Sequence, residues 1–108
     1  MKLLTKACIL FLLVLISGCG ASIAITGNAQ DPIPTGNVKV YFNKDPECSY
    51  DDVGLLEDSG NAYSMDGLFS NFKKKAASVG ADGVIISQID KHPLGVYRGT
   101  ATAIRCNN

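Results

Sequence analysis

A short apolar run near the start of the chain decides how much of the sequence is left to fold. Residues 7–16 are ten consecutive apolar residues, and Lys2 and Lys6 give the flanking segment a positive charge. Ten residues are too few to cross a hydrocarbon core, which takes roughly 20. A positive segment, a short apolar run and then small residues are typical of an export signal peptide. We therefore expect residues 1–18 to be removed.

The apolar run ends in the sequence Leu15-Ile16-Ser17-Gly18-Cys19, which resembles a bacterial lipobox. The resemblance implies that diacylglycerol is attached to the Cys19 thiol, that the chain is cut after Gly18, and that the new N-terminus is acylated. Two or three acyl chains anchor a protein stably, whereas one chain holds it weakly. We therefore expect a protein of the cell envelope, held on a membrane by lipid on Cys19. An ordinary signal peptide, cut for example after Ala21, is the alternative.

The residue after the lipidated cysteine bears on which membrane holds the protein. In Gram-negative bacteria, aspartate at that position is associated with retention at the inner membrane. This chain has Gly20 there. The pattern implies sorting to the outer membrane, with the domain facing the periplasm.

The charged residues favour neither nucleic acid binding nor catalysis. The chain has 10 basic and 10 acidic residues and no basic stripe, so we expect no nucleic acid partner. His92 is the single histidine, and it precedes Pro93 in a predicted turn. Cys-x-x-Cys is absent, and His92 is not at ligand spacing from a cysteine, so we expect no metal and no cofactor. Three acidic pairs are predicted to be exposed carboxylates in loops or at strand ends: Asp45/Glu47, Asp51/Asp52 and Glu57/Asp58. The sequence therefore predicts a protein that is not an enzyme.

Two cysteines remain for the exported domain once Cys8 leaves with the signal peptide and Cys19 carries lipid. These are Cys48 and Cys106. Export leads to an oxidising compartment, where paired cysteines form disulfides. A bond between them would close a loop of about 59 residues and stabilise the fold by roughly 4 kcal/mol. A metal pair and a redox-active thiol are the alternatives.

The mature chain divides into a tether and one small domain. Residues 19–37 contain turn-forming residues together with Pro32 and Pro34, so we expect the lipidated cysteine and a linker, with a possible short strand at Ser22–Thr26. Residues 38–108 hold four predicted strands, at 38–42, 52–58, 84–89 and 97–106, and a helix at 64–79. The order β-β-α-β-β predicts the α+β class, with one helix packed on a small sheet.

The helix has clear start and stop signals. Its apolar positions fall on one face: Met65, Leu68, Phe69, Phe72, Ala76 and Val79. Ser64 is suited to cap its start, and Gly80 to end it in a left-handed conformation. Gly99, Ala101 and Ala103 share one face of the last strand, where small side chains allow the helix to approach closely.

The candidate interaction surface consists of aromatic and basic residues. Tyr41 and Tyr97 are amphipathic aromatics of the kind enriched at interfaces. Lys73 and Lys74 belong to a lysine run in the second half of the helix. This run is either a solvated face that complements the helix dipole or a contact with anionic headgroups or a partner.

Several segments of the domain together resemble a known group of proteins. They are Val38–Phe42, the run Tyr50-Asp-Asp-Val-Gly-Leu-Leu56, residues 72–86 and the run 99–105. The chain resembles a family of small, uncharacterised bacterial lipoproteins and, more distantly, the YbjQ/RcsF-like fold, which includes the sensor lipoprotein of the Rcs envelope-stress system. That sensor has two disulfides and a long proline-rich and basic linker, neither of which this chain can match. The resemblance supplies no catalytic residue.

Taken together, these patterns predict a lipoprotein that binds a protein partner in envelope sensing or maintenance. The alternative is a lipoprotein that binds a small ligand or the cell wall through its tyrosines and an open sheet face.

Overall fold

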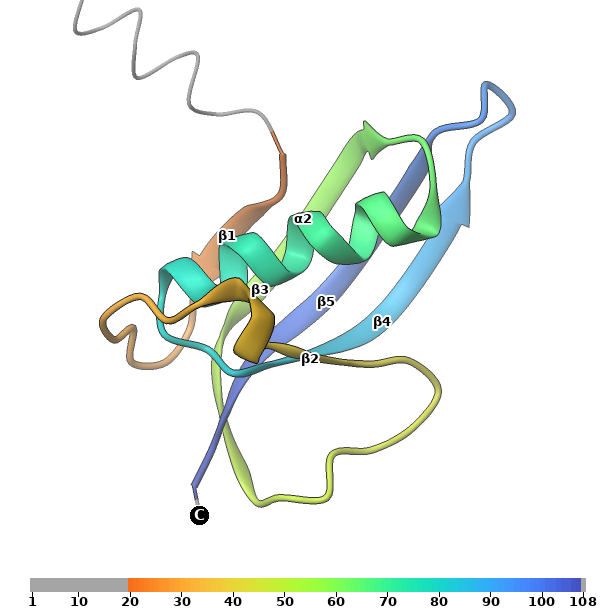
Figure 1. The fold of residues 1–108 in the computed structure, drawn as a ribbon. Coiled ribbons are helices and arrows are strands. Elements are labelled where there is room, and N and C mark those ends of the chain that lie inside the picture. Colours follow the sequence, from red (N-terminus) through yellow and green to blue (C-terminus); the bar gives the residue numbers. More distant parts are fainter. Residues whose placement is uncertain (1–19, 108) are drawn as a thin grey trace, which may run out of the picture.

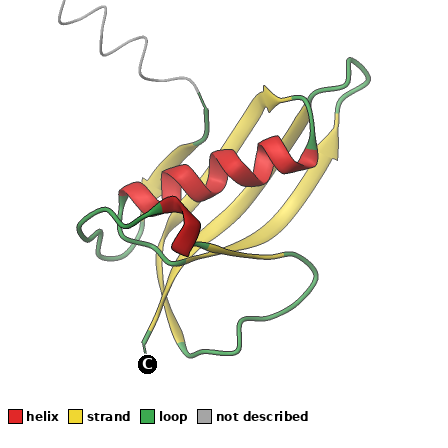
Figure 2. Cartoon of the chain, in the orientation of Figure 1, coloured by secondary structure: helices red, strands yellow, loops and turns green. Residues whose placement is uncertain are grey.

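The domain is a five-stranded mixed sheet with one helix packed on one face (Figures 1 and 2). The computed structural model describes residues 20–107, so the predicted signal peptide and Cys19 lie outside the described residues. The strand order is β1-β3-β5-β4-β2, and only β2 and β4 pair in parallel. The strands are β1 (Ser22–Ile25), β2 (Lys39–Tyr41), β3 (Tyr50–Ala62), β4 (Gly83–Lys91) and β5 (Tyr97–Cys106). The predicted α+β class, with one helix on a small sheet, is confirmed.

The segment predicted to be a tether is part of the folded domain. β1 pairs with β3 along one edge of the sheet, and a short 3-10 turn, η1 (Thr35–Asn37), leads into β2. The backbone between β1 and η1 passes the end of the helix α2 (Met65–Ser78), whose last carbonyls lack intrahelical donors. Two backbone N–H groups of this segment donate to carbonyls at the helix end. The Gln30 N–H donates to the Val79 carbonyl at 2.8 Å, and the Ile33 N–H donates to the Ala77 carbonyl at 3.0 Å.

Both ends of α2 form as the sequence predicts. Ser64 caps the start, because its Oγ accepts a hydrogen bond from the Gly67 N–H at 3.0 Å. Gly80 ends the helix with φ +77°. The Gly80 and Ala81 N–H groups donate back to Ala77 and Ala76, the double hydrogen bond of a Schellman motif.

The core lies between α2 and the sheet. Leu68, Phe72 and Ala76 on the helix are fully buried and face β5, where Ala101 and Ala103 are also buried. A Cβ at Gly99 would lie 3.2 Å from Leu68 Cδ2 and 2.9 Å from the Gln88 carbonyl oxygen. The prediction that small residues on this strand admit the helix is therefore confirmed.

β3 is longer than predicted, because residues 59–61 do not break it. The strand continues to Ala62 through a register shift between Asp58 and Ala62, where Gly60 has φ +125°. A glycine at positive φ is typical of a β-bulge, which bends a strand without ending it. The Asp58 carboxylate holds the bulge, accepting from the Gly60 N–H at 3.1 Å and from Asn71 Nδ2 on α2 at 2.8 Å.

The burial of Asp58 corrects the prediction that its acidic pair is exposed. Glu57 is exposed, but Asp58 is only 1% exposed. A buried carboxylate needs hydrogen-bond donors, and the bulge and α2 provide them. Its role is to join β3 to the helix.

The predicted disulfide links Cys48, in the loop after β2, to Cys106 at the end of β5. The two Cα atoms are 5.7 Å apart, within the usual range for a bridged pair. Residues 42–49 therefore form a loop fixed at both ends, by β2 and by the disulfide.

Candidate functional site

An open groove lies between the edge strand β2 and the helix α2. It has a volume of about 530 Å³. Its helix side is formed by Asp66, Phe69, Ser70 and Lys73, and its strand side by Thr35, Val38, Lys39, Val40, Tyr41 and Lys44. The helical residues fall at i, i+3, i+4 and i+7, so they form one stripe along α2.

The strand side of the groove has unused backbone hydrogen-bonding groups. β2 pairs only with β4, so its other edge is free within the described sheet. The Lys39 N–H donates to the Asp82 carbonyl beside β4 at 3.1 Å. Because residues alternate along a strand, Val40 then directs its N–H and C=O away from β4. A free edge of this kind can pair with an added strand.

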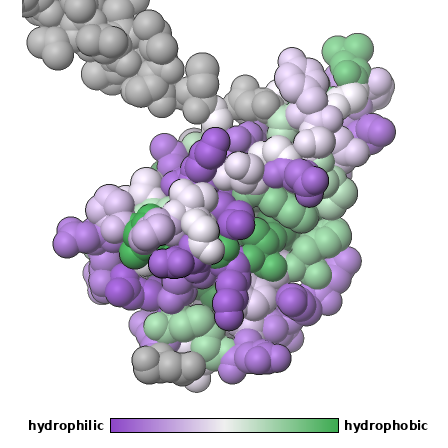
Figure 3. All heavy atoms as spheres, in the orientation of Figure 1, coloured by the Kyte–Doolittle hydropathy of each residue, from purple (hydrophilic) through white to green (hydrophobic). Residues whose placement is uncertain are grey.

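The groove is basic with an apolar floor. Lys39, Lys44 and Lys73 line it, and Asp66 is the one carboxylate among its described lining residues. Val38 is 2% exposed and Val40 is half-buried beneath it. Hydrophobic surface is visible in this region of Figure 3, with hydrophilic side chains beside it.

An aromatic pair joins a residue of the groove to the chain after β2: Phe69, which lines the groove, contacts Phe42. Phe42 follows β2 directly and is 43% exposed, and its ring centroid lies 6.0 Å from that of Phe69 on α2. The rings are tilted by 54°, an arrangement that aromatic pairs favour. Lys44 Nζ lies 5.9 Å from the centre of the Tyr41 ring, within range of a cation–π contact.

A second hollow meets the groove across β2. Lys39, Tyr41 and Lys44 line both, and the second hollow continues to Cys48 and Cys106 with Asp45 and Glu47 at its rim. The disulfide therefore fixes the loop that shapes this side of the site. Both hollows depend on the position of that loop.

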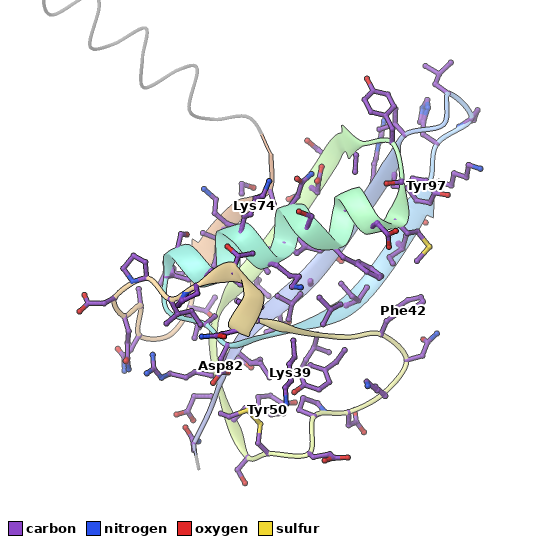
Figure 4. All side chains as sticks on the ribbon, viewed as in Figure 1. Lys39, Phe42, Tyr50, Lys74, Asp82 and Tyr97 are labelled. Carbon is purple, nitrogen blue, oxygen red and sulfur yellow. A yellow bond between two sulfur atoms is a disulfide. The ribbon has the colours of Figure 1, made fainter. Side chains whose placement is uncertain are left out.

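The structure separates the four residues predicted to form one interaction surface. Tyr41 and Lys73 both line the groove. Lys74 lies on the other flank of α2, in a hollow with Gly20 and Ala21 at the start of the described chain. Tyr97 lies at the far end of β5, with Lys91 Nζ 5.8 Å from its ring centre. Figure 4 shows Lys74 and Tyr97 on the upper side of the domain, with Lys39 and Phe42 on the lower side.

Sequence reasoning missed the contributions of Lys39, Phe42, Lys44 and Phe69 to this site. The sequence does place Phe42 and Phe69 on the apolar faces of their elements. It does not show that the two faces meet at a sheet edge, because that depends on the parallel pairing of β2 with β4.

The remaining predicted features lie away from the groove. His92 is in the turn between β4 and β5, where its N–H donates to the Val96 carbonyl and its carbonyl accepts from Gly95. Among residues 20–107, no group of three or more His, Cys, Asp or Glu side chains could hold a metal ion. Over the same residues, no helix is long and apolar enough to span a membrane.

No family model, curated protein or solved structure matches the chain. The resemblance to the YbjQ/RcsF-like fold therefore stays a prediction.

Proposed function

We propose that this chain is a lipid-anchored, non-enzymatic envelope protein that binds an extended, acidic segment of a protein partner in the groove between β2 and α2. The observation that carries the proposal is the free edge of β2 beside a basic groove with an apolar floor. An extended segment that pairs with such an edge gains backbone hydrogen bonds, and its alternate side chains reach the adjacent pockets.

The charge of the groove supports an acidic partner. Lys39, Lys44 and Lys73 line the groove with one carboxylate, Asp66, whereas Asp45 and Glu47 line the second hollow across β2. Lysine on a short edge strand discourages pairing in general, so a segment that pairs here needs carboxylates to offset the lysine charge. Carboxylates on the incoming segment would complement Lys39 and Lys73, one on each wall of the groove.

Lipid on Cys19 would allow a short binding site to hold the partner protein. β2 has only three residues, so the number of backbone hydrogen bonds is small. Anchoring both proteins at one membrane raises their effective concentration, and weak contacts then give lasting association. We place the protein at the outer membrane, facing the periplasm, on the basis of Gly20 after Cys19.

Reversing the charge of Lys73 should weaken capture of the partner, whereas reversing Lys74 should not. Losing an attraction and gaining a repulsion at a partly exposed site costs about 1 kcal/mol, or about fivefold in affinity. Lys73→Glu is therefore expected to lower the yield of captured partner about fivefold. The measurement is in-cell crosslinking of tagged full-length protein, with captured envelope proteins quantified by mass spectrometry.

Lys74→Glu is the matched control, because it changes the same charge in the same turn of α2 but lies outside the groove. Both substitutions have the same effect on the helix dipole. An equal loss of captured partner for the two variants would contradict a specific role of the groove in binding. Recovery of lipid and cell-wall fragments alone would favour the alternative, a ligand- or wall-binding lipoprotein.

A further inference from the structure

The start of the described chain leaves no room for a linker between the lipid and the sheet. Ala21 is half-buried against the core, and Ser22 already pairs with Glu57 in β3. Two residues, Gly20 and Ala21, lie between a lipidated Cys19 and Ser22, the first residue of β1. The three residue steps from Cys19 to Ser22 span about 11 Å at most. An anchor at Cys19 would hold this end of β1 directly at the bilayer surface.

The direction of β1 shows which part of the domain lies near the anchor. β1 is antiparallel to β3, so the chain before Ser22 points along β3 toward Ala62. Ala62 pairs with Tyr97 at the start of β5, next to the turn that joins β4 to β5. Figure 1 shows the start of β1 and this turn on the same, upper side of the domain.

The same end of the domain exposes two large hydrophobic side chains. Tyr63, directly after β3, and Leu94, in the turn after β4, are each 81% exposed, well above the 56% of Leu55. The tip of the β4–β5 hairpin appears as hydrophobic surface in Figure 3. A tyrosine with an apolar ring and a polar hydroxyl suits the boundary between headgroups and acyl chains.

Charge at this end is mixed, so apolar contact is the main attraction. Lys74 shares a hollow with Gly20, and Lys91 lies beside Tyr97. Glu57, Asp90 and Arg98 line another hollow nearby. These charges do not exclude an anionic surface, and they do not require one.

We propose that Tyr63 and the turn at residues 92–95 rest on the same bilayer that holds Cys19, with the Tyr63 ring and the Leu94 side chain in the headgroup region. This rests on the proposed lipidation of Cys19. The domain then contacts the membrane at two places, the start of β1 and the hairpin tip. β2 lies at the opposite edge of the sheet from β1, so the groove stays open to a partner.

Tryptophan fluorescence tests the contact, because the chain has no tryptophan of its own. Tyr63→Trp puts a reporter at the proposed contact, and Leu94→Trp reports on the turn independently. Tyr50→Trp is the matched control: it is the same substitution at an exposed site at the other end of β3, about 40 Å away. Each full-length, lipidated variant is reconstituted in vesicles of phosphatidylethanolamine and phosphatidylglycerol, with or without bromine on the acyl chains near the headgroups.

The expected result is a blue-shifted emission for Tyr63→Trp and Leu94→Trp, with about twofold quenching by the brominated lipid and none for Tyr50→Trp. Flotation of the same samples separates the two proposals. Variants that float with the vesicles but show no quenching at Trp reporters 63 and 94 would overturn the contact and leave the lipid anchor intact. Protein that does not float would overturn the anchor, and the contact with it.

Discussion

Replacing Cys48 and Cys106 together by alanine should lower the free energy of unfolding by about 4 kcal/mol. The disulfide spans a sequence separation of 58 and joins the loop after β2 to the end of β5. Without it, the unfolded chain gains the freedom that the closed loop removes. Small domains have a total stability of about 5–15 kcal/mol, so this loss is a large share of the total. The measurement is urea unfolding of a chain that begins at Gly20.

Reduction of the wild-type domain is the control for the substitution itself. A reducing agent should lower the stability of the wild-type domain by a similar amount and leave the double variant unchanged. If substitution and reduction each change the free energy of unfolding by less than about 1 kcal/mol, a stabilising role of the disulfide is contradicted. Two free thiols in protein isolated from the periplasm would contradict formation of the bond in the cell.

Replacing Cys19 by serine should abolish lipid attachment. The thiol is the proposed acceptor of diacylglycerol, and a serine hydroxyl is a far weaker nucleophile than a thiolate. Without that modification, the cut after Gly18 is also expected to fail. Metabolic labelling with a fatty acid, followed by intact mass analysis, should therefore find the wild-type chain shortened and acylated and the variant neither shortened nor labelled.

Cys8→Ser is the matched control, because Cys8 lies inside the apolar run and is removed with residues 1–18. This variant should be processed and labelled like the wild type. An unmodified Cys19 in wild-type protein extracted from membranes would contradict the anchor. It would instead favour an ordinary signal peptide.

Local signals were enough to predict the helix and its surroundings. Ser64 and Gly80 act within one turn of α2, so their roles depend only on nearby residues. The alternation of residues along β5 predicted a face of small side chains, and Gly99 on that face does lie against Leu68. The disulfide followed from export and from counting cysteines.

Errors arose where the structure depends on residues far apart in the sequence. The short strand predicted at Ser22–Thr26 does form, but the segment around it is not a free linker: β1 pairs with β3, and the chain that follows donates to the end of α2. Asp58 accepts from the nearby Gly60 N–H and also from Asn71 on α2. The pairing of β1 with β3 and the contact of Asp58 with Asn71 cannot be identified from the local sequence pattern.

The candidate site was predicted only in part, for the same reason. Tyr41 and Lys73 line one groove because β2 pairs in parallel with β4, which places one edge strand beside α2. The same topology directs Lys74 and Tyr97 elsewhere. Residue type indicated which side chains suit an interface, but the sheet order decides which of them share one.

In-cell photocrosslinking from two positions tests the central claim, that the groove is the partner-binding surface. A photoreactive residue replaces Ser70 in the groove or, as the control, Leu55 on the sheet face that α2 does not cover, where Leu55 is 56% exposed. We expect position 70 to give an adduct with one envelope protein through an acidic segment, and position 55 to give none. An adduct from position 55 and none from position 70 would contradict the groove and place the binding surface on the open face of the sheet.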